Sequence, residues 1–288
     1  MSWQLALFFN IIFGTLRGTL AKKLVNKIDP FVMVFHMVYL SLPLYLFYYF
    51  FEKQSEFILY LEMMVLGIIF YFGYIAFLFA ARISLSKSVV YSSYFLIITL
   101  CLTAIFLDEW RYFNPTTTYG SKNILGIIIA AVSLYVMFKS DSGREKLKDF
   151  RWLTLMLFNI ITNGVGSFWV KIFLINHTPI QALFSQTVGI LPASLTVNKI
   201  MKKNLFGINK SDYFLIIINS IFDFSALIFY YIALKDGPAM LVIPISTIAL
   251  TISITLAGLI FFKEMKQFSG GKFFGLFLGI LGVVLLVL

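Results

Sequence analysis

Charge is scarce in this sequence of 288 residues. Asp, Glu, Lys and Arg together make up 12% of the chain, whereas hydrophobic residues make up 60%. Soluble globular domains carry about 25% charged residues. A chain this apolar has too little polar surface to face water. The composition therefore excludes a soluble globular protein and predicts an integral membrane protein whose main partner is the lipid bilayer.

Cysteine and histidine are almost absent, and the common enzyme motifs are missing. The single cysteine, Cys101, excludes a disulfide framework and a cysteine-based metal site. His36 and His177 are far apart and no His-Glu-x-x-His motif occurs, so we expect no metal site. The sequence also contains no phosphate-binding Gly-x-x-x-x-Gly-Lys-Ser/Thr loop and no Gly-x-Ser-x-Gly elbow. We therefore expect neither enzymatic activity nor a cofactor.

Negative charge is scarcer than positive charge, which leaves a net charge of +10. In a soluble protein this excess would suggest nucleic-acid binding. Here the Lys and Arg residues fall mostly between apolar segments, where they mark helix ends and contact lipid headgroups. We expect no nucleic-acid partner.

Long apolar runs fill the rest of the chain, and a bilayer core is crossed by about 20 helical residues. We predict an all-α integral membrane protein with ten transmembrane helices. The predicted spans are 3–21, 31–51, 57–80, 87–107, 122–138, 152–174, 180–198, 213–234, 239–262 and 272–288.

The longest charged stretch, residues 139–151, divides the chain into two five-helix repeats, 1–138 and 152–288. A shift of 149 positions aligns Asn10 with Asn159 and Lys22 with Lys171. The matched pairs at this shift also include Phe9 with Phe158, Pro30 with Pro179 and Pro43 with Pro192. Because each repeat has an odd number of helices, the two must enter the membrane from opposite sides. Inverted repeats of this kind commonly place a substrate site at their interface.

Several short motifs resemble the drug/metabolite transporter superfamily, specifically its ten-helix EamA-type members. The resembling motifs are Gly164-x-Gly166-x-Phe168-Trp169-x-Lys171 followed by Pro179, Leu107-Asp108-Glu109, and the glycines Gly275, Gly279 and Gly282. The resemblance implies a transporter fold over essentially the whole chain and both termini in the cytoplasm. It conflicts with the charge distribution. Connections after odd-numbered helices hold 18 Lys and Arg against 5 on the other side, and the positive-inside rule then places the termini outside.

Arg17 is the first candidate for function, because ionisable groups inside apolar spans are costly and usually functional. A helix places Asn10, Gly14 and Arg17 on one stripe, and the repeat places Asn159 and Asn163 on a similar stripe. We expect the two stripes to line a shared cavity that binds substrate. The alternative is that their small residues only permit close helix packing.

Asp223 is the second candidate, since it lies in the middle of an apolar span opposite the neutral Tyr71 in the repeat. Its carboxylate could bind a proton, bind a cationic substrate group or neutralise Arg17.

Other candidates are weaker. Lys22, Lys171, Trp169 and Tyr71 are substrate-binding candidates, with snorkelling of the lysines to headgroups and aromatic packing as the alternatives. Glu109 and Glu264 are expected to cap helix ends or to pair with neighbouring lysines. His36 is expected to be a satisfied core histidine, with a proton relay as the alternative. Pro244 interrupts a span and is expected to form a kink or break for gating.

Together these features favour a secondary transporter in the cell (inner) membrane. It would move a small organic solute, amino-acid-like or otherwise polar or zwitterionic, by alternating access, and proton coupling is an option. Either a monomer or a homodimer fits the sequence. The rival hypothesis is a non-transporting membrane protein, such as a lipid-modifying enzyme or a subunit of a complex.

Overall fold

A computed structural model describes residues 1–51, 58–83, 85–141, 150–261 and 270–287. The described residues form helices joined by turns and short connections, with no β-strand among them. The helices are α1 (Trp3–Val25), α2 (Pro30–Phe51), α3 (Leu61–Ile83), α4 (Leu85–Ser92), α5 (Phe95–Phe106), the 3₁₀ helix η1 (Glu109–Phe113), α6 (Thr118–Asp141), α7 (Phe150–Asn176), α8 (Pro179–Ile200), α9 (Lys210–Asp236), α10 (Ala239–Phe261) and α11 (Gly270–Val287).

Eight of these helices are long and apolar enough to cross a membrane: α1, α2, α3, α6, α7, α8, α9 and α10. A helix rises 1.5 Å per residue, so about 20 residues match a hydrocarbon core about 30 Å thick. The expected class, an all-α multi-pass membrane protein, is confirmed. Two shorter apolar helical segments, Phe95–Phe106 and Phe273–Leu286, lie within the two remaining predicted spans. The charged stretch 139–151 is described only at its ends, where α6 finishes and α7 begins.

The predicted span 87–107 consists of two helices, α4 and α5, separated by a turn at Ser93 and Tyr94. The Ser93 hydroxyl donates to the carbonyl of Val89 at 3.1 Å, so it competes with the backbone for the helical acceptor. In the second half, α10 continues as a helix through Pro244. The break thus lies near Ser93, in the region that the repeat pairs with Pro244, and not at the proline itself.

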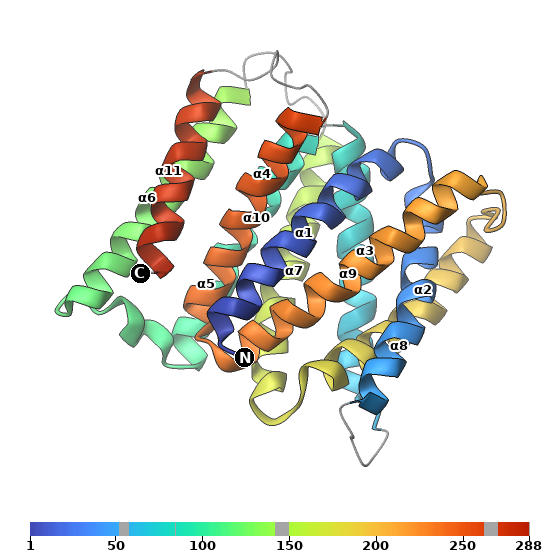
Figure 1. The fold of residues 1–288 in the computed structure, drawn as a ribbon, viewed down its shortest axis with the longest axis horizontal. Coiled ribbons are helices and arrows are strands. Elements are labelled where there is room, and N and C mark those ends of the chain that lie inside the picture. The colour runs from blue at the N-terminus through green and yellow to red at the C-terminus, as the bar shows by residue number, and fades with distance from the viewer. Residues whose placement is uncertain (52–57, 84, 142–149, 262–269, 288) are drawn as a thin grey trace.

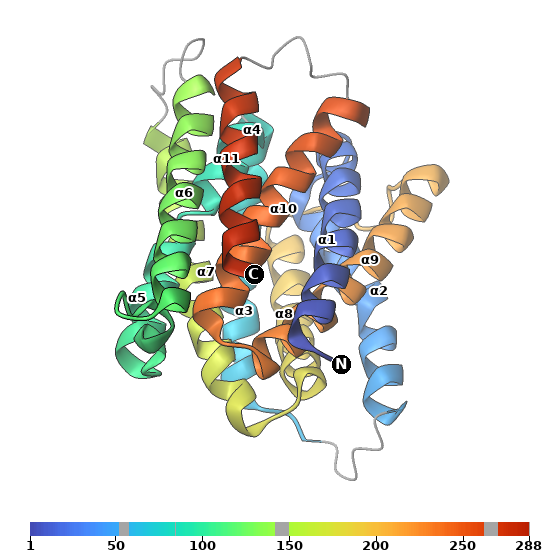
Figure 2. The same cartoon turned by 60° about the vertical axis from the view of Figure 1, so that its left-hand side comes forward.

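Helices that are far apart in the sequence lie side by side (Figure 1). Helix α1 packs along α9 and α10, while α7 packs along α3 and α5. Helix α2 packs against α8, and α6 pairs with α11 at one edge of the molecule, as both Figure 1 and Figure 2 show. The two halves of the chain therefore share one body, in which most helices have their principal partners in the other half.

Glycines permit a close contact between α3 and α8. A Cβ atom on Gly67 would meet the backbone of Gln186, and one on Gly189 would meet the backbone of Met64. Backbone atoms cannot rotate away as a side chain can, so only glycine allows this crossing.

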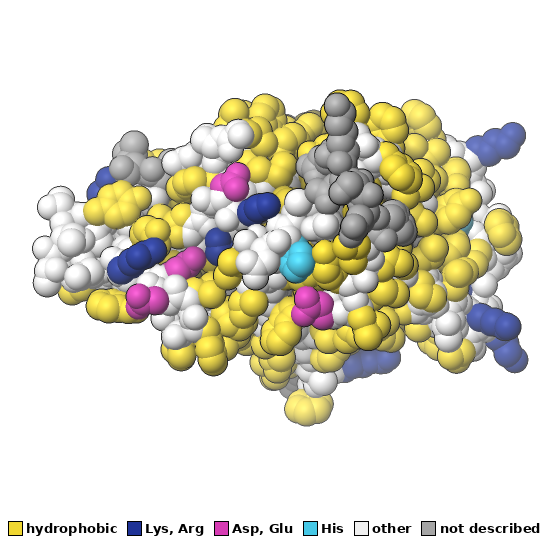
Figure 3. Space-filling view, turned by 90° about the horizontal axis from the view of Figure 1, so that it is seen from below, with side chains coloured by type: hydrophobic (Ala, Val, Ile, Leu, Met, Phe, Trp, Pro, Cys, Tyr) yellow, Lys and Arg dark blue, Asp and Glu magenta, His cyan; other side chains and the backbone are white. Residues whose placement is uncertain are grey.

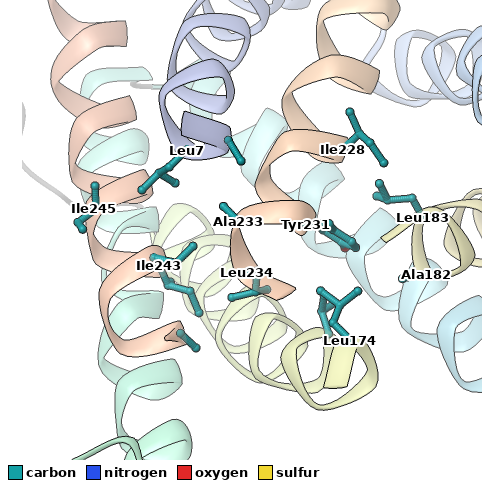
Figure 4. Close-up of a cluster of buried hydrophobic side chains, with 14 of the residues drawn as sticks. Leu7, Leu174, Ala182, Leu183, Ile228, Tyr231, Ala233, Leu234, Ile243 and Ile245 are labelled. Atoms are coloured by element: carbon teal, nitrogen blue, oxygen red, sulfur yellow. The ribbon is translucent and has the colours of Figure 1, made fainter. Parts of the chain in front are cut away.

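The largest apolar core lies around the junction where α9 ends and α10 begins (Figure 4). It draws on the start of α1, the end of α7 and the start of α8. The labelled members are Leu7, Leu174, Ala182, Leu183, Ile228, Tyr231, Ala233, Leu234, Ile243 and Ile245. We call this the terminal end of the molecule, because α1 begins here. Figure 3 looks onto it and shows charged side chains scattered among hydrophobic ones.

Candidate functional site

A cavity of about 330 Å³ lies between the two halves of the chain. Its described walls come from α1, α3, α4 and α5 of the first half and from α7, α9 and α10 of the second. The lining extends from Asn10 and Asn163 to Lys22 and Val25, in the last turns of α1. The cavity therefore extends away from the terminal end, toward what we call the cavity end.

Arg17 and Asp223 form an ion pair between α1 and α9, with 2.8 Å from Nε to Oδ1. Their side chains are 27% and 15% exposed. Two charges removed from water need such a partner, because an unpaired charge in an apolar interior is costly. Of the options that the sequence left for Asp223, the structure contains the contact with Arg17.

The two partners lie differently with respect to the cavity. Arg17 lines it, whereas Asp223 is not among the described lining residues. The guanidinium also lies over the ring of Tyr74, with 5.4 Å from Cζ to the ring centroid. An aromatic face attracts a cation, so α3 and α9 together hold the Arg17 head group at the cavity wall.

Asn10 and Asn159 make matching hydrogen bonds to the opposite half of the chain. The Asn10 side chain donates to the carbonyl of Ala226 in α9 at 2.9 Å and accepts from the Ser246 hydroxyl in α10 at 2.8 Å. The Asn159 side chain donates to the carbonyl of Gly73 in α3 at 3.0 Å and accepts from Ser92 in α4 at 2.8 Å.

Both amides are nearly fully buried, at 4% and 2% exposed, so their satisfied groups fix the helices around them. Asn10 also lines the cavity, whereas Asn159 supports it from behind.

The deeper part of the cavity is lined by hydroxyl and amide groups. Asn163 lines it and donates to the Asn159 carbonyl at 2.9 Å. Ser93 and Thr251 lie 3.0 Å apart, hydroxyl to hydroxyl, across the wall formed by α4 and α10. Thr247 adds another hydroxyl from α10.

The two aligned lysines have different surroundings. Lys22 lines the cavity. Lys171 lies outside the described lining and donates from Nζ to the carbonyls of Leu234 at 2.7 Å and Gly237 at 2.8 Å. Those carbonyls belong to the last turn and C-cap of α9, where a cation also interacts favourably with the helix dipole.

Glu109 holds the adjoining helix start. Its carboxylate accepts from the backbone N–H of Ala239 at 3.1 Å and of Met240 at 2.8 Å, at the first residues of α10. The side chain is buried, so these charge-assisted bonds satisfy both the carboxylate and the helix terminus. The expected helix-capping role of Glu109 is confirmed, while Glu264 lies outside the described residues. Lys171, bonded to the end of α9, and Glu109, bonded to the start of α10, together hold the α9–α10 junction. We call their four hydrogen bonds, to Leu234, Gly237, Ala239 and Met240, the junction clamp.

Three further candidates from the sequence lie away from the cavity lining: Tyr71, Trp169 and Pro244. Tyr71 is buried in a small apolar cluster with Val34 and Ile75. Trp169 is 45% exposed on the outer surface of α7.

Sequence reasoning missed the hydroxyls of α10. Thr247 and Thr251 are four residues apart and so share one helix face, and Ser246 adjoins Thr247. That spacing is the signal that would have identified them. His36 Nε2 donates to the carbonyl of Leu205 at 2.7 Å, away from this site. Across the part of the chain that the structure describes, no three His, Cys, Asp or Glu side chains gather as metal ligands would.

Comparison with known proteins shows the fold alone. No protein family and no curated protein matches the sequence. Twenty-seven chains of solved structures match. One of them, described as a crystal structure of a protein, aligns with a TM-score of 0.74 at 17% identity, covering 98% of this chain and 95% of that one. The fold is therefore shared with an experimentally solved protein over nearly its full length.

Proposed function

We propose that this chain is a secondary transporter, of the drug/metabolite transporter type, that moves a small organic metabolite across the cell (inner) membrane. The observation that carries the proposal is the cavity between the two halves, with the Arg17 head group at its wall. A concave, mostly apolar space with a few convergent polar groups is the usual form of a small-molecule site. An intramembrane cation at such a site points to recognition of a solute.

The proposed architecture is ten spans in two inverted five-helix repeats. Support comes from the matching bonds of Asn10 and Asn159, which are aligned by the shift of 149 residues and each reach a third and a fourth helix of the other half. The helix pairing is reciprocal in the same way, since α1 lies on α9 and α10 while α7 lies on α3 and α5. The α4–α5 pair and α11 supply the two spans beyond the eight long ones.

Alternating access is supported by the difference between the two ends. The junction clamp and the apolar core of Figure 4 occupy the terminal end. The cavity extends toward the other end. A transporter that alternates would close the cavity end and release the clamp in the opposite state.

The test is uptake into proteoliposomes from a broad panel of labelled small organic solutes. We expect saturable uptake of at least one solute class by the native chain. The double variant Arg17→Gln/Asp223→Asn should lose it, because it removes the Arg17 cation without leaving its buried partner charge unpaired. The control is Arg111→Gln, which makes the same Arg-to-Gln replacement at an exposed residue of η1. This variant should transport normally.

Absence of flux for the whole panel, with the protein shown to be folded, would contradict the transporter proposal. It would favour the rival class of a membrane enzyme or a complex subunit. Normal flux in the double variant would instead leave transport in place and remove Arg17 and Asp223 from its mechanism.

A further inference from the structure

We infer that the cavity selects a small organic anion, whose carboxylate is held by the Arg17 guanidinium. This inference deepens the proposed function, because it names the charge of the solute at the same site. It also departs from the expectation of an amino-acid-like or zwitterionic solute.

The charge of the described cavity lining is of one sign. The described lining residues include two cations, Arg17 and Lys22, and no Asp or Glu. Asp223, which would have to bind the ammonium of a zwitterion, is occupied by Arg17 Nε and is not among those lining residues. A solute in the cavity therefore meets the cationic member of the pair.

The guanidinium of Arg17 has the geometry to bind a carboxylate. Arginine has five N–H donors in a planar fork that matches a carboxylate with two parallel bonds. Asp223 Oδ1 lies 2.8 Å from Nε, the nitrogen nearest the chain, and Tyr74 lies against the guanidinium. These two neighbours fix the plane of the head group, so less rotamer entropy is lost when an anion binds.

The rest of the cavity wall is mostly apolar. Apolar side chains such as Phe77, Leu250 and Ile254 make up much of it, and hydroxyls of Ser93 and Thr247 lie deeper. At about 330 Å³ the cavity is at the low end of ligand sites. These features suit a small carboxylate with an apolar body better than a large or multiply charged solute.

The experiment uses two matched triplets on the full-length protein in detergent, with binding followed by thermal stabilisation. The first triplet is isobutyrate, isobutyramide and isobutylamine, and the second is phenylacetate, phenylacetamide and 2-phenylethylamine. We expect the carboxylate to bind about tenfold or more tightly than its amide, with the amine weakest, in at least one triplet, since charged hydrogen bonds are roughly twice as strong as neutral ones.

Variants then assign the preference to Arg17. Arg17→Gln/Asp223→Asn should bring the carboxylate and the amide to equal affinity, whereas Arg111→Gln should leave the preference unchanged. Arg17→Lys keeps a positive charge without the fork, and it should retain only part of the preference.

Three results would overturn the inference: tighter binding of an amine, no carboxylate preference in either triplet, or a preference that survives in the double variant. Failure of the transport proposal gives a different pattern. Carboxylate binding without flux would keep the anion site and reject the transporter, whereas flux of neutral or cationic solutes alone would keep the transporter and reject the anion site.

Discussion

Helices α1 and α7 begin the two halves in the proposed repeat, and the lysines that the shift of 149 residues aligns have different surroundings. Lys171 is bonded to the last carbonyls of α9, where the apolar core fills the terminal end. Lys22 lines the cavity at the opposite end. At the same time, Asn10 and Asn159 make matching bonds to the other half. The middle of the molecule is therefore similar in the two halves, and the difference is concentrated at the ends.

This comparison separates two kinds of residue. Residues that bond alike in both halves are expected to hold the fold together in every state. Residues whose surroundings differ between the ends are expected to change partners when the cavity changes sides.

The largest effect is expected for Glu109→Gln, which weakens the junction clamp. Glutamine lacks the negative charge and offers only one oxygen to the two N–H groups of α10. A charged hydrogen bond contributes about 1.5–3 kcal/mol, so its loss corresponds to about tenfold or more in the opening equilibrium. The readout is the rate at which a thiol reagent added on the terminal side labels the cysteine of Thr247→Cys, in a protein whose native thiol is removed by Cys101→Ser. Glu109→Gln should raise this rate.

Glu62→Gln is the matched control for this experiment, because Glu62 is an exposed acid at the same end. It should leave the labelling rate unchanged. Equal labelling in all three proteins would mean that the junction clamp does not close the terminal end.

A smaller and symmetric effect is expected for Asn10→Ala and Asn159→Ala. Each removes a buried amide and leaves a carbonyl and a serine hydroxyl without their partner, at about 1–3 kcal/mol of unfolding free energy. The two losses should agree within about 1 kcal/mol, because the bonds match. Denaturant unfolding in mixed micelles measures both, with the exposed Asn209→Ala as control. A large loss for one variant and none for the other would break the symmetry argument.

The smallest effect on stability is expected for Gly14→Ala. The new Cβ would press against the end of the Leu250 side chain, which lines the cavity and can rotate aside. We expect less than about 1 kcal/mol of destabilisation but a measurable fall in solute affinity, because the displaced side chain narrows the cavity. Gly270→Ala adds a methyl group in open space and should change neither quantity. A Gly14 variant with unaltered affinity would place the binding site elsewhere.

The sequence predicted the helices well because each apolar run is long and its ends carry charge, Pro or Asn. It also selected Arg17 and Asp223, since ionisable groups in apolar spans stand out without any structure. It left contact between the two as one of three options for Asp223, because the choice depends on how α1 crosses α9. The α10 hydroxyls were missed for a related reason, since serine and threonine are common in helices and only the lining of a cavity distinguishes them.

The central claim is that a solute passes through the cavity between the halves, and blocking that cavity tests it most directly. In proteoliposomes carrying Thr247→Cys in the Cys101→Ser background, a bulky thiol reagent attached at residue 247 should abolish uptake of the transported solute. The same reagent attached at Cys101 of the native chain, which is exposed on α5, should leave uptake unchanged. Undiminished uptake after complete modification at residue 247 would contradict the account.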